Sequence, residues 1–342
     1  MILPDLKIDI SKIKDRKSKK LKWGVAGLGR FSEQAIIPGI QFLRKSKLYS
    51  VYSRDLSHSK SIAEKFGIPY HFDNYNNFLK SDISAVYIGS ANNHHYELVI
   101  KAAEAGKNIL CDKPLALTSR EAEEMVNVCK KNNVFLTINL PYRFHPLIKK
   151  AKELINDEFL GKIVTINVNF NIDYAPNDNF RFVKEYGGGA LMDLGPHMLD
   201  LLRFLNGEIK LITGFVDNVV YKSPVDDFAA GIVQYERGGY GYFNVSFNNK
   251  KSFNRIDIIG HKGAISIEGL IRGKAHSAKM TILMEGEAKK AFRKGGNKLH
   301  LLLKSVQNSF IKNIEPEVTG YDGLANIKLM EELVEGCKKL QG

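Results

Sequence analysis

Along its first 140 residues the chain alternates short apolar runs with longer amphipathic stretches. Apolar runs rich in β-branched and aromatic residues predict buried strands, and apolar residues spaced three or four apart predict helices. Strands that alternate with helices predict a parallel sheet with right-handed crossovers. The predicted strands are 22–26, 48–53, 70–72, 85–88, 108–111 and 134–138, and the predicted helices are 31–42, 57–66, 75–80, 94–105 and 118–132.

From Ile163 the pattern changes to a strict alternation of apolar and polar residues, as in IVTINVNFNIDY. Such alternation is typical of strands with one buried face. Glycine-containing turns at 236–239 and 260–263 separate some of the later runs. We therefore expect a large, mostly antiparallel open sheet with few covering helices. Its predicted strands begin at 163 and continue at 209–220, 228–235, 239–247, 255–259 and 264–267, with a helical segment at 188–205.

One face of this second sheet is expected to carry the helical segment and the substrate, which leaves the opposite face bare. A bare apolar sheet face usually marks an interface between subunits. The residues predicted to form that bare face are Val168, Phe170, Phe243, Val245 and Phe247.

The composition is that of a soluble globular protein, with 44% hydrophobic and 25% charged residues. No run of about 18 apolar residues is present, so no membrane contact is expected, and the N-terminal segment lacks the features of a signal peptide. Cys111, Cys129 and Cys337 are far apart and show no metal-ligand spacing. We expect reduced thiols in a cytoplasmic protein and no metal site.

The formal charge of +13 is concentrated in the first 22 residues and in the segment 272–298. Clustered lysine and arginine can serve nucleic acid or anionic membranes. Here few aromatic residues lie among the basic ones, and no nucleic-acid-binding motif appears. Solvated basic surface, or attraction of phosphorylated ligands, is the favoured interpretation, and no nucleic-acid partner is expected.

A glycine-rich turn follows the first predicted strand. Gly27 permits a tight turn, and Gly29 lets the backbone approach a pyrophosphate at the start of the next helix, where free N–H groups favour an anion. The third position of this dinucleotide-binding pattern is Ser32 rather than glycine or alanine. The turn predicts a nicotinamide-dinucleotide site, although a purely structural strand–turn–helix would look similar. The predicted contacts in this turn are Gly27, Leu28, Gly29, Arg30 and Phe31.

Further polar residues follow the other strands of the first half, at the edge where such sheets bind ligands. Ser53 and Arg54 end the second strand, and a guanidinium there suits the 2′-phosphate of NADP. The alternative is that Asp55 binds the ribose hydroxyls of NAD. NADP(H) is therefore the preferred cofactor and NAD(H) the second choice, with Ser90 and Lys113 converging on the same crevice.

The segment GGGALMDLGPHMLD at 187–200 places Asp193 and His197 four residues apart. On a helix these two side chains share one face, and a carboxylate beside an imidazole is suited to proton transfer. The alternative is a capping aspartate followed by a partly buried histidine.

Taken together, these motifs resemble the Gfo/Idh/MocA family (glucose–fructose oxidoreductase and inositol dehydrogenase) from about Leu21 to the C-terminal helix. The segments that carry the resemblance are GVAGLGRFS, SANNHHYELVIKAAEAGKNILCDKPLALT at 90–118, YRFHP at 142–146, GGGALMDLGPHMLD and EPEVTGYDGLANIKLMEEL. The resemblance implies an N-terminal Rossmann doubly wound parallel sheet followed by a C-terminal domain with a large, mostly antiparallel open sheet. The predicted domains are a basic arm at 1–20, a dinucleotide-binding domain at 21–140 and an α+β substrate-binding and oligomerisation domain at 141–342. A C-terminal helix at 320–340 is expected to pack back on the first domain.

The resemblance also implies roles for individual residues. The family's Glu-Lys-Pro is Asp112-Lys113-Pro114 here, and its Thr-Pro-Asn-x-x-His is the segment from Ser90 to His95, in which Asn92 and His95 match. The residues expected to carry catalysis are Lys113, Asp193 and His197. Ser90, Asn92, His95, Asp112 and Lys113 are expected to bind the cofactor, and Lys113, Tyr142, Arg143, Asp193 and His197 the substrate.

The function that these features predict is hydride transfer between NADP(H) or NAD(H) and a sugar, a polyol or a related hydroxy or keto compound. His197 would exchange the hydroxyl proton, and Lys113 would polarise the substrate oxygen. A redox-assisted glycosidase and a catalytically silent cofactor-binding regulator are the alternatives. The resemblance further implies a homodimer or homotetramer formed through the second sheet. The segment Phe180-Arg181-Phe182 fits either substrate contact or ordinary packing.

Overall fold

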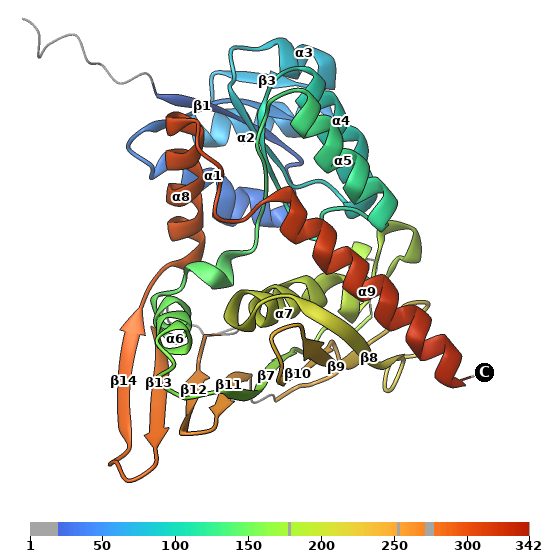
Figure 1. Cartoon of the computed structure of the whole chain (residues 1–342). Helices are drawn as coiled ribbons and strands as arrows, with labels where there is room; N and C mark the ends of the chain where they lie inside the picture. The colour runs from blue at the N-terminus through green and yellow to red at the C-terminus, as the bar shows by residue number, and fades with distance from the viewer. Residues whose placement is uncertain (1–19, 177–178, 252–253, 271–276, 342) are drawn as a thin grey trace, which may run out of the picture.

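Two β-sheets, one in each half of the chain, organise the protein (Figure 1). The computed structural model describes residues 20–176, 179–251, 254–270 and 277–341. The predicted basic arm at 1–20 lies, apart from its last residue, outside these ranges, as does part of the basic cluster at 272–298. Within the described residues no helix is long and apolar enough to cross a membrane.

The first sheet has six parallel strands in the order β3-β2-β1-β4-β5-β6. The chain starts at the centre, builds one side and then returns to build the other, which is the predicted doubly wound arrangement. Fully buried aliphatic and aromatic residues such as Trp23 and Val86 fill its strands. The strands are β1 (Leu21–Ala26), β2 (Ser46–Tyr52), β3 (Tyr70–Phe72), β4 (Ala85–Ile88), β5 (Asn108–Cys111) and β6 (Leu136–Ile138).

Helices connect these strands almost where the amphipathic pattern predicts them. The first connection differs in detail, because a π-helical segment, η2 (Ser32–Ile36), precedes α1 (Ile37–Gln41). Pro38 lacks the N–H that a regular helix would use, and the wider turn before it accommodates that loss. The remaining helices of this half are α2 (Leu56–Phe66), α3 (Tyr75–Lys80), η3 (Asn92–His94), α4 (His95–Glu104), α5 (Ser119–Lys131), η4 (Pro141–Phe144) and α6 (Pro146–Asn156).

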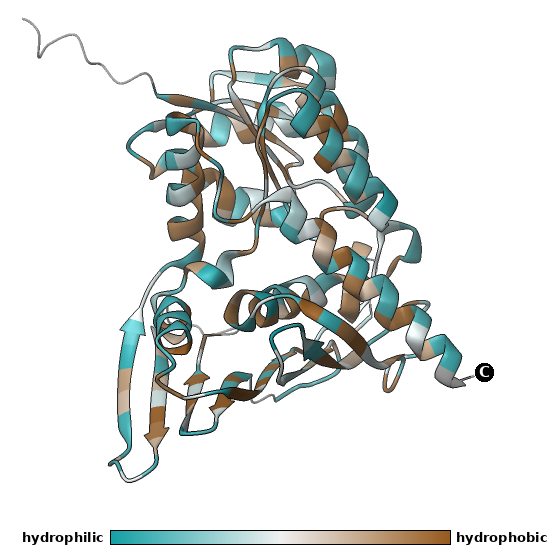
Figure 2. Ribbon diagram, viewed as in Figure 1, coloured by the Kyte–Doolittle hydropathy of each residue, from teal (hydrophilic) through white to brown (hydrophobic). Residues whose placement is uncertain are grey.

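The second sheet has eight strands in the order β14-β13-β12-β11-β7-β10-β9-β8, and only the pair β7 and β10 is parallel. Its last two strands were absent from the sequence prediction. Every residue of β14 is exposed, and the strand is mostly hydrophilic (Figure 2). A short, cationic edge strand protects a sheet from pairing with other chains. The strands are β7 (Ile163–Asn171), β8 (Ile209–Asp217), β9 (Phe228–Tyr235), β10 (Tyr240–Ser246), β11 (Arg255–Gly260), β12 (Gly263–Glu268), β13 (Ser277–Met284) and β14 (Lys290–Gly295).

The prediction of which residues form the bare face of this sheet was wrong. All five of them are buried on the face covered by α7 (Ala190–Asn206). Side chains alternate between the faces of a strand, so a one-residue error in assigning the inner face exchanges the two sets. The open face instead carries the alternate positions, among them Leu211, Phe215, Ile232 and Tyr242, with exposures of 51%, 54%, 45% and 42%. The five residues that were wrongly predicted to lie on the open face are Val168, Phe170, Phe243, Val245 and Phe247.

The last two helices join the two halves of the molecule (Figure 1). Helix α8 (Lys298–Lys312) returns to the first sheet, where Phe310 packs 5.8 Å from Trp23 and Ser46 donates to Gln307 at 2.9 Å. Helix α9 (Gly320–Gln341) crosses from the first sheet to β8, and its Glu331 accepts a hydrogen bond from the backbone of Ser119. The C-terminal segment therefore fixes how the two sheets face each other.

Candidate active site

A cavity of about 1850 Å³ extends from the carboxyl ends of β1, β2, β4 and β5 to α7 of the second half. Its walls come from the loops after the strands of the first sheet, from the end of β7 and the segment that follows it, and from the first residues of α7 and α8. The topology of a doubly wound sheet brings these loops to one edge. The cavity therefore joins the predicted dinucleotide turn to the predicted catalytic helix.

The glycine turn forms one end of the cavity and fits a dinucleotide. Gly27 has φ +88°, and a Cβ there would lie 2.4 Å from the backbone nitrogen of Ser90, so only glycine fits. A Cβ on Gly29 would meet nothing within 4 Å, which leaves this part of the backbone open to a ligand. Ser32 replaces the usual third glycine because its hydroxyl donates to the carbonyl of Gly27 at 2.6 Å and closes the turn. Leu28, Arg30 and Phe31 also line this end.

A cationic rim follows β2. Ser53 and Arg54 both line the cavity, and Nη1 of Arg54 lies 3.3 Å from Nε2 of His94. Asp55 does not line it. Its carboxylate caps α2 by accepting from the backbone of Ser57 at 2.8 Å and of His58 at 3.2 Å. The Arg54 guanidinium, and not the Asp55 carboxylate, therefore faces the cavity.

The loop after β4 contributes Ser90 and Asn92 to the wall, and Asn92 donates to the carbonyl of Gly187 at 3.3 Å. His95 is completely buried behind this wall. Its ring nitrogens lie 2.9 Å from the carbonyl of Pro114 and 3.2 Å from that of Ser90. The predicted contact of His95 with the cofactor is therefore corrected, since this side chain holds together the loops that follow β4 and β5.

The far end of the cavity is built around the carboxylate of Asp193, in the first turn of α7. Lys113 donates to its Oδ1 at 2.6 Å and to its backbone carbonyl at 2.8 Å. Arg181 donates to Oδ2 at 2.9 Å. Burial alone would raise the pKa of this carboxyl group, but the two cations hold the pKa of Asp193 well below its usual range. Asp193 is therefore ionised and fixes Lys113 at the cavity wall.

His197 lies one turn further along α7, as the spacing predicts. Its ring packs 5.1 Å from the ring of Tyr142 and 6.1 Å from that of Phe170. The pKa of His197 is lowered to about 3, mainly by burial and also by the nearby ammonium groups of Lys113 and Lys298, although Asp193 opposes them. Nδ1 is buried without a partner among the described residues, which leaves Nε2 to face the cavity. The imidazole is neutral at pH 7 and can accept a proton.

Asp112 connects Lys113 to the first sheet. Its Oδ1 accepts from the backbone of Lys113 at 2.9 Å and from the amide of Asn139 at 3.2 Å, and the hydroxyl of Tyr87 donates to Oδ2 at 3.1 Å. Asp112 lines the cavity, so the shorter side chain still reaches the wall.

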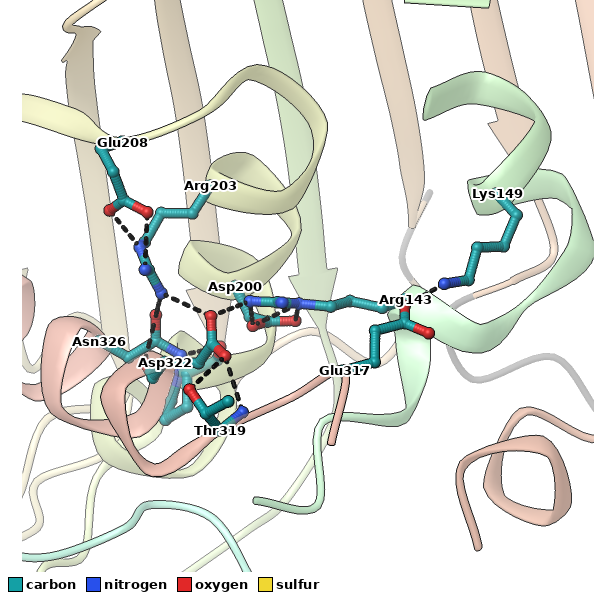
Figure 3. A network of polar contacts seen from close by, with 10 residues as sticks. Arg143, Lys149, Asp200, Arg203, Glu208, Glu317, Thr319, Asp322 and Asn326 are labelled. Carbon is teal, nitrogen blue, oxygen red and sulfur yellow. Dashed lines mark hydrogen bonds and ion pairs between the residues drawn. The ribbon is translucent and has the colours of Figure 1, made fainter. Parts of the chain in front are cut away.

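Tyr142 and Arg143 were predicted together as substrate contacts, but the structure separates them. Tyr142 lines the cavity, whereas Arg143 points away from it and bonds to Asp200 and Asp322 (Figure 3). The two residues lie in the short 3₁₀ helix η4, where successive side chains point about 120° apart. Arg143 is therefore corrected from a substrate contact to a structural ion pair.

Two cations at this end of the cavity were missed by the sequence prediction. Arg181 was left open between substrate contact and packing, and the structure places it on Asp193. Lys298 belongs to the cluster interpreted as solvated basic surface or as attracting phosphorylated ligands, and its side chain lines the cavity. Both come from parts of the chain that are distant in sequence from Asp193 or lie in irregular segments, so no local spacing indicated their positions.

The glycine turn of the parallel sheet opens into a cavity that holds a lysine, a carboxylate and a neutral histidine. This combination defines the nicotinamide-dinucleotide oxidoreductase class of protein. Comparison with known proteins agrees. Residues 21–140 match the oxidoreductase family with an NAD-binding Rossmann fold, and residues 148–266 match the Gfo/Idh/MocA C-terminal domain. The chain belongs to the Gfo/Idh/MocA oxidoreductase family.

Two similar relatives are dehydrogenases. The chain is 27% identical to trans-1,2-dihydrobenzene-1,2-diol dehydrogenase of Xenopus tropicalis over 72% of this chain and 74% of that protein. It is 28% identical to D-xylose 1-dehydrogenase (NADP(+)) 2 of Haloferax volcanii over 68% of this chain and 71% of that protein. In fold it is similar to aldose-aldose oxidoreductase from Caulobacter crescentus, with a TM-score of 0.86, 24% identity, and coverage of 94% of this chain and 98% of that one.

Proposed function

We propose that this protein catalyses reversible hydride transfer between a nicotinamide dinucleotide and the carbinol or carbonyl carbon of a sugar, a polyol or a related compound. The observation that carries the proposal is that Lys113, Asp193 and His197 meet at one end of a single cavity whose other end is the Gly27–Gly29 turn. The dehydrogenase relatives support the substrate class, because their names specify a sugar and a diol.

In the oxidation direction the substrate hydroxyl must lose a proton as its carbon loses a hydride. The neutral Nε2 of His197 accepts that proton, and the Lys113 ammonium stabilises the charge that develops on the oxygen. Asp193 binds Lys113 and Arg181, so the ammonium is held in one place. The bound cofactor would supply only the hydride acceptor, held by the glycine turn and by the loops after β2, β4 and β5.

We further propose NADP(H) as the preferred cofactor. The support is the Arg54 guanidinium beside His94 at the rim of the cavity, together with the capping role that occupies Asp55. A guanidinium favours a 2′-phosphate by charge-assisted hydrogen bonds, whereas a carboxylate would favour free ribose hydroxyls.

The deciding experiment follows absorbance of the reduced nicotinamide in both directions. Polyols, aldoses and keto-sugars are offered with each cofactor to the wild type, to Lys113→Met and to the control Lys131→Met, which alters the last residue of α5. We expect turnover by the wild type and the control, faster with NADP(H), and a loss of about 10²- to 10⁴-fold in kcat for Lys113→Met. Substrate cleavage without net change of the cofactor would contradict the dehydrogenase assignment and favour a redox-assisted glycosidase.

The same proposal includes a cytoplasmic homo-oligomer. All three cysteines are buried and unpaired, as suits a reducing compartment. The open face of the second sheet offers exposed apolar side chains from adjacent strands, with Ile232 and Tyr242 directly paired across β9 and β10. A second copy of the same face would cover them, by a two-fold contact of the kind most soluble oligomers use.

A further inference from the structure

The end of the cavity that holds His197 contains a cation that the proposed reaction does not use. Lys298 is the first residue of α8, and its side chain lines the cavity. Its Nζ lies 4.9 Å from the centroid of the Tyr142 ring, and the His197 ring lies 5.1 Å from the same centroid. The ammonium and the imidazole therefore flank one aromatic ring, close enough for one sugar-sized molecule to contact both.

Within the described part of the chain no carboxylate pairs with Lys298. Burial lowers the pKa of Lys298, and no acidic group of the described residues is seen to oppose that effect. The neighbouring cations differ in this respect, because Lys113 and Arg181 share the carboxylate of Asp193. Among the described residues, Lys298 is thus the cation near His197 that has no counter-ion.

Among the described residues, the two other carboxylates at this end of the cavity have polar partners elsewhere. Asp112 accepts from Asn139 and from the hydroxyl of Tyr87. Asp173 accepts from the hydroxyl of Tyr221 at 2.8 Å.

The position of Lys298 is also unfavourable for a cation on general grounds. The N-terminus of a helix carries a partial positive charge, so a lysine at its first position is repelled rather than stabilised. A partly buried ammonium without a counter-ion loses some of its hydration with no charged group to replace it. A solvated lysine would avoid both costs by turning outward, and this one lies instead against Tyr142 inside the cavity.

We propose that Lys298 binds an anionic group of the substrate, so that the enzyme acts on a sugar or polyol bearing a carboxylate or a phosphate. This inference rests on the proposed function, because it assumes that the reacting hydroxyl lies at His197 while the anion lies at Lys298. The Tyr142 ring separates the two and provides an apolar surface for the carbon skeleton between them. A neutral sugar would leave the ammonium desolvated and unpaired, which makes the site select against it.

The test compares three ligands that share one carbon skeleton and differ in charge: glucose, glucuronate and glucose 6-phosphate. Their binding to the enzyme saturated with oxidised cofactor is measured by calorimetry. The variants are Lys298→Met, which keeps the length of the stem and removes the charge, and Lys298→Arg, which restores a cation. Lys304→Met is the matched control, because Lys304 lies in the same helix but is exposed and does not line the cavity.

We expect at least one of the two anions to bind roughly 10- to 100-fold more tightly than glucose, the range of a charge-assisted hydrogen bond. Lys298→Met should abolish that preference, whereas Lys298→Arg and Lys304→Met should retain most of it. A preference for glucuronate alone assigns a carboxylate, and a preference for glucose 6-phosphate alone assigns a phosphate.

The inference is overturned if neither anion binds more tightly than glucose, or if Lys298→Met leaves the preference unchanged. Cofactor affinity is recorded in the same series by quenching of protein fluorescence. A wild type that binds the cofactor and turns over neutral sugars but shows no preference for either anion would refute the anion site and leave the proposed function standing. Failure of the wild type to bind either cofactor would refute both.

Discussion

At the scale of single residues, the chemistry of the site follows from its small number of charged groups and from the contacts that hold them in place. Asp193 accepts hydrogen bonds from Lys113 and Arg181, and these two cations stabilise its ionised form. His197 remains neutral because it is buried near ammonium groups. A base that is neutral at pH 7 and an ammonium held in a fixed position are the two groups that the proposed alcohol oxidation requires.

The low pKa of His197 gives a prediction about pH. In the cofactor-free enzyme, nitrogen NMR should show a neutral imidazole down to pH 5, with the signal assigned by its loss in His197→Gln. Lys113→Met should raise the pKa of His197, because a neighbouring cation that lowers it is removed. A titration of His197 near its ordinary value of 6.5 would contradict this account.

The same shift affects stability with a definite sign. As the pH falls from 6.5 towards 3, His197 binds a proton in the unfolded chain but stays unprotonated in the folded protein. The free energy of unfolding should therefore decrease across this range. His197→Gln should remove that part of the decrease, as measured by denaturant unfolding at several pH values.

At the scale of elements, the glycine turn and the helix bearing Asp193 and His197 could be predicted because each has a local cause. A positive φ demands Gly27, and the spacing of Asp193 and His197 fits one helical face. Arg181 and Lys298 could not be predicted, because they reach the site through tertiary packing rather than through their neighbours in sequence. The inner face of the second sheet was assigned wrongly because alternation reveals two faces without saying which one the helix covers.

The two glycines of the turn should respond differently to the same substitution. Gly27→Ala forces a Cβ to within 2.4 Å of a backbone nitrogen at a φ of +88°, so it should destabilise the protein by more than about 1 kcal/mol. Gly29→Ala places its methyl group in open space and should leave stability unchanged, while weakening cofactor binding about tenfold, or 1.4 kcal/mol. Thermal unfolding and cofactor titration measure the two effects. Equal effects of the two variants on stability would show that the turn is not constrained as described.

A second prediction at this scale concerns the ion-pair network behind α7 (Figure 3). Arg143 donates from Nε at 2.9 Å to Asp200, which is buried, and also pairs with Asp322 of α9. Arg143→Met leaves these carboxylates buried without their guanidinium and should cost about 3–5 kcal/mol in denaturant unfolding. The control Lys150→Met breaks an exposed pair with Glu153 and should change stability by about 0.5 kcal/mol or less. Similar values for the two variants would show that the network contributes little.

At the scale of the whole molecule, the order of most strands and helices could be predicted from periodicity, but the strands β13 and β14 and the path of α8 could not. Every residue of β14 is exposed, so this strand shows little apolar alternation for a sequence to reveal. Nothing local in α8 indicates that it will return to the first sheet, because its partners Trp23 and Ser46 stand at the opposite end of the chain. Long-range packing of this kind is decided by the complete fold.

The open face of the second sheet gives the prediction for assembly. Light scattering of the wild type should report at least twice the chain mass of 38.5 kDa. The double variant Ile232→Lys, Tyr242→Lys places charges on adjacent strands of that face and should give the mass of a single chain. Tyr321→Lys, which alters an equally exposed residue of α9, should leave the assembly unchanged. A monomeric wild type would refute the proposed contact.

The return of α8 to the first sheet has a consequence for how the protein is made. A ribosome releases Trp23 among the first residues of the fold and Phe310 among the last. Until α8 emerges, the flank of the first sheet around Trp23 lacks its cover, so the nascent chain carries exposed apolar surface through most of its synthesis. The packing of the dinucleotide-binding half is completed only after most of the other half has been synthesised. Both halves therefore complete their folds late in synthesis.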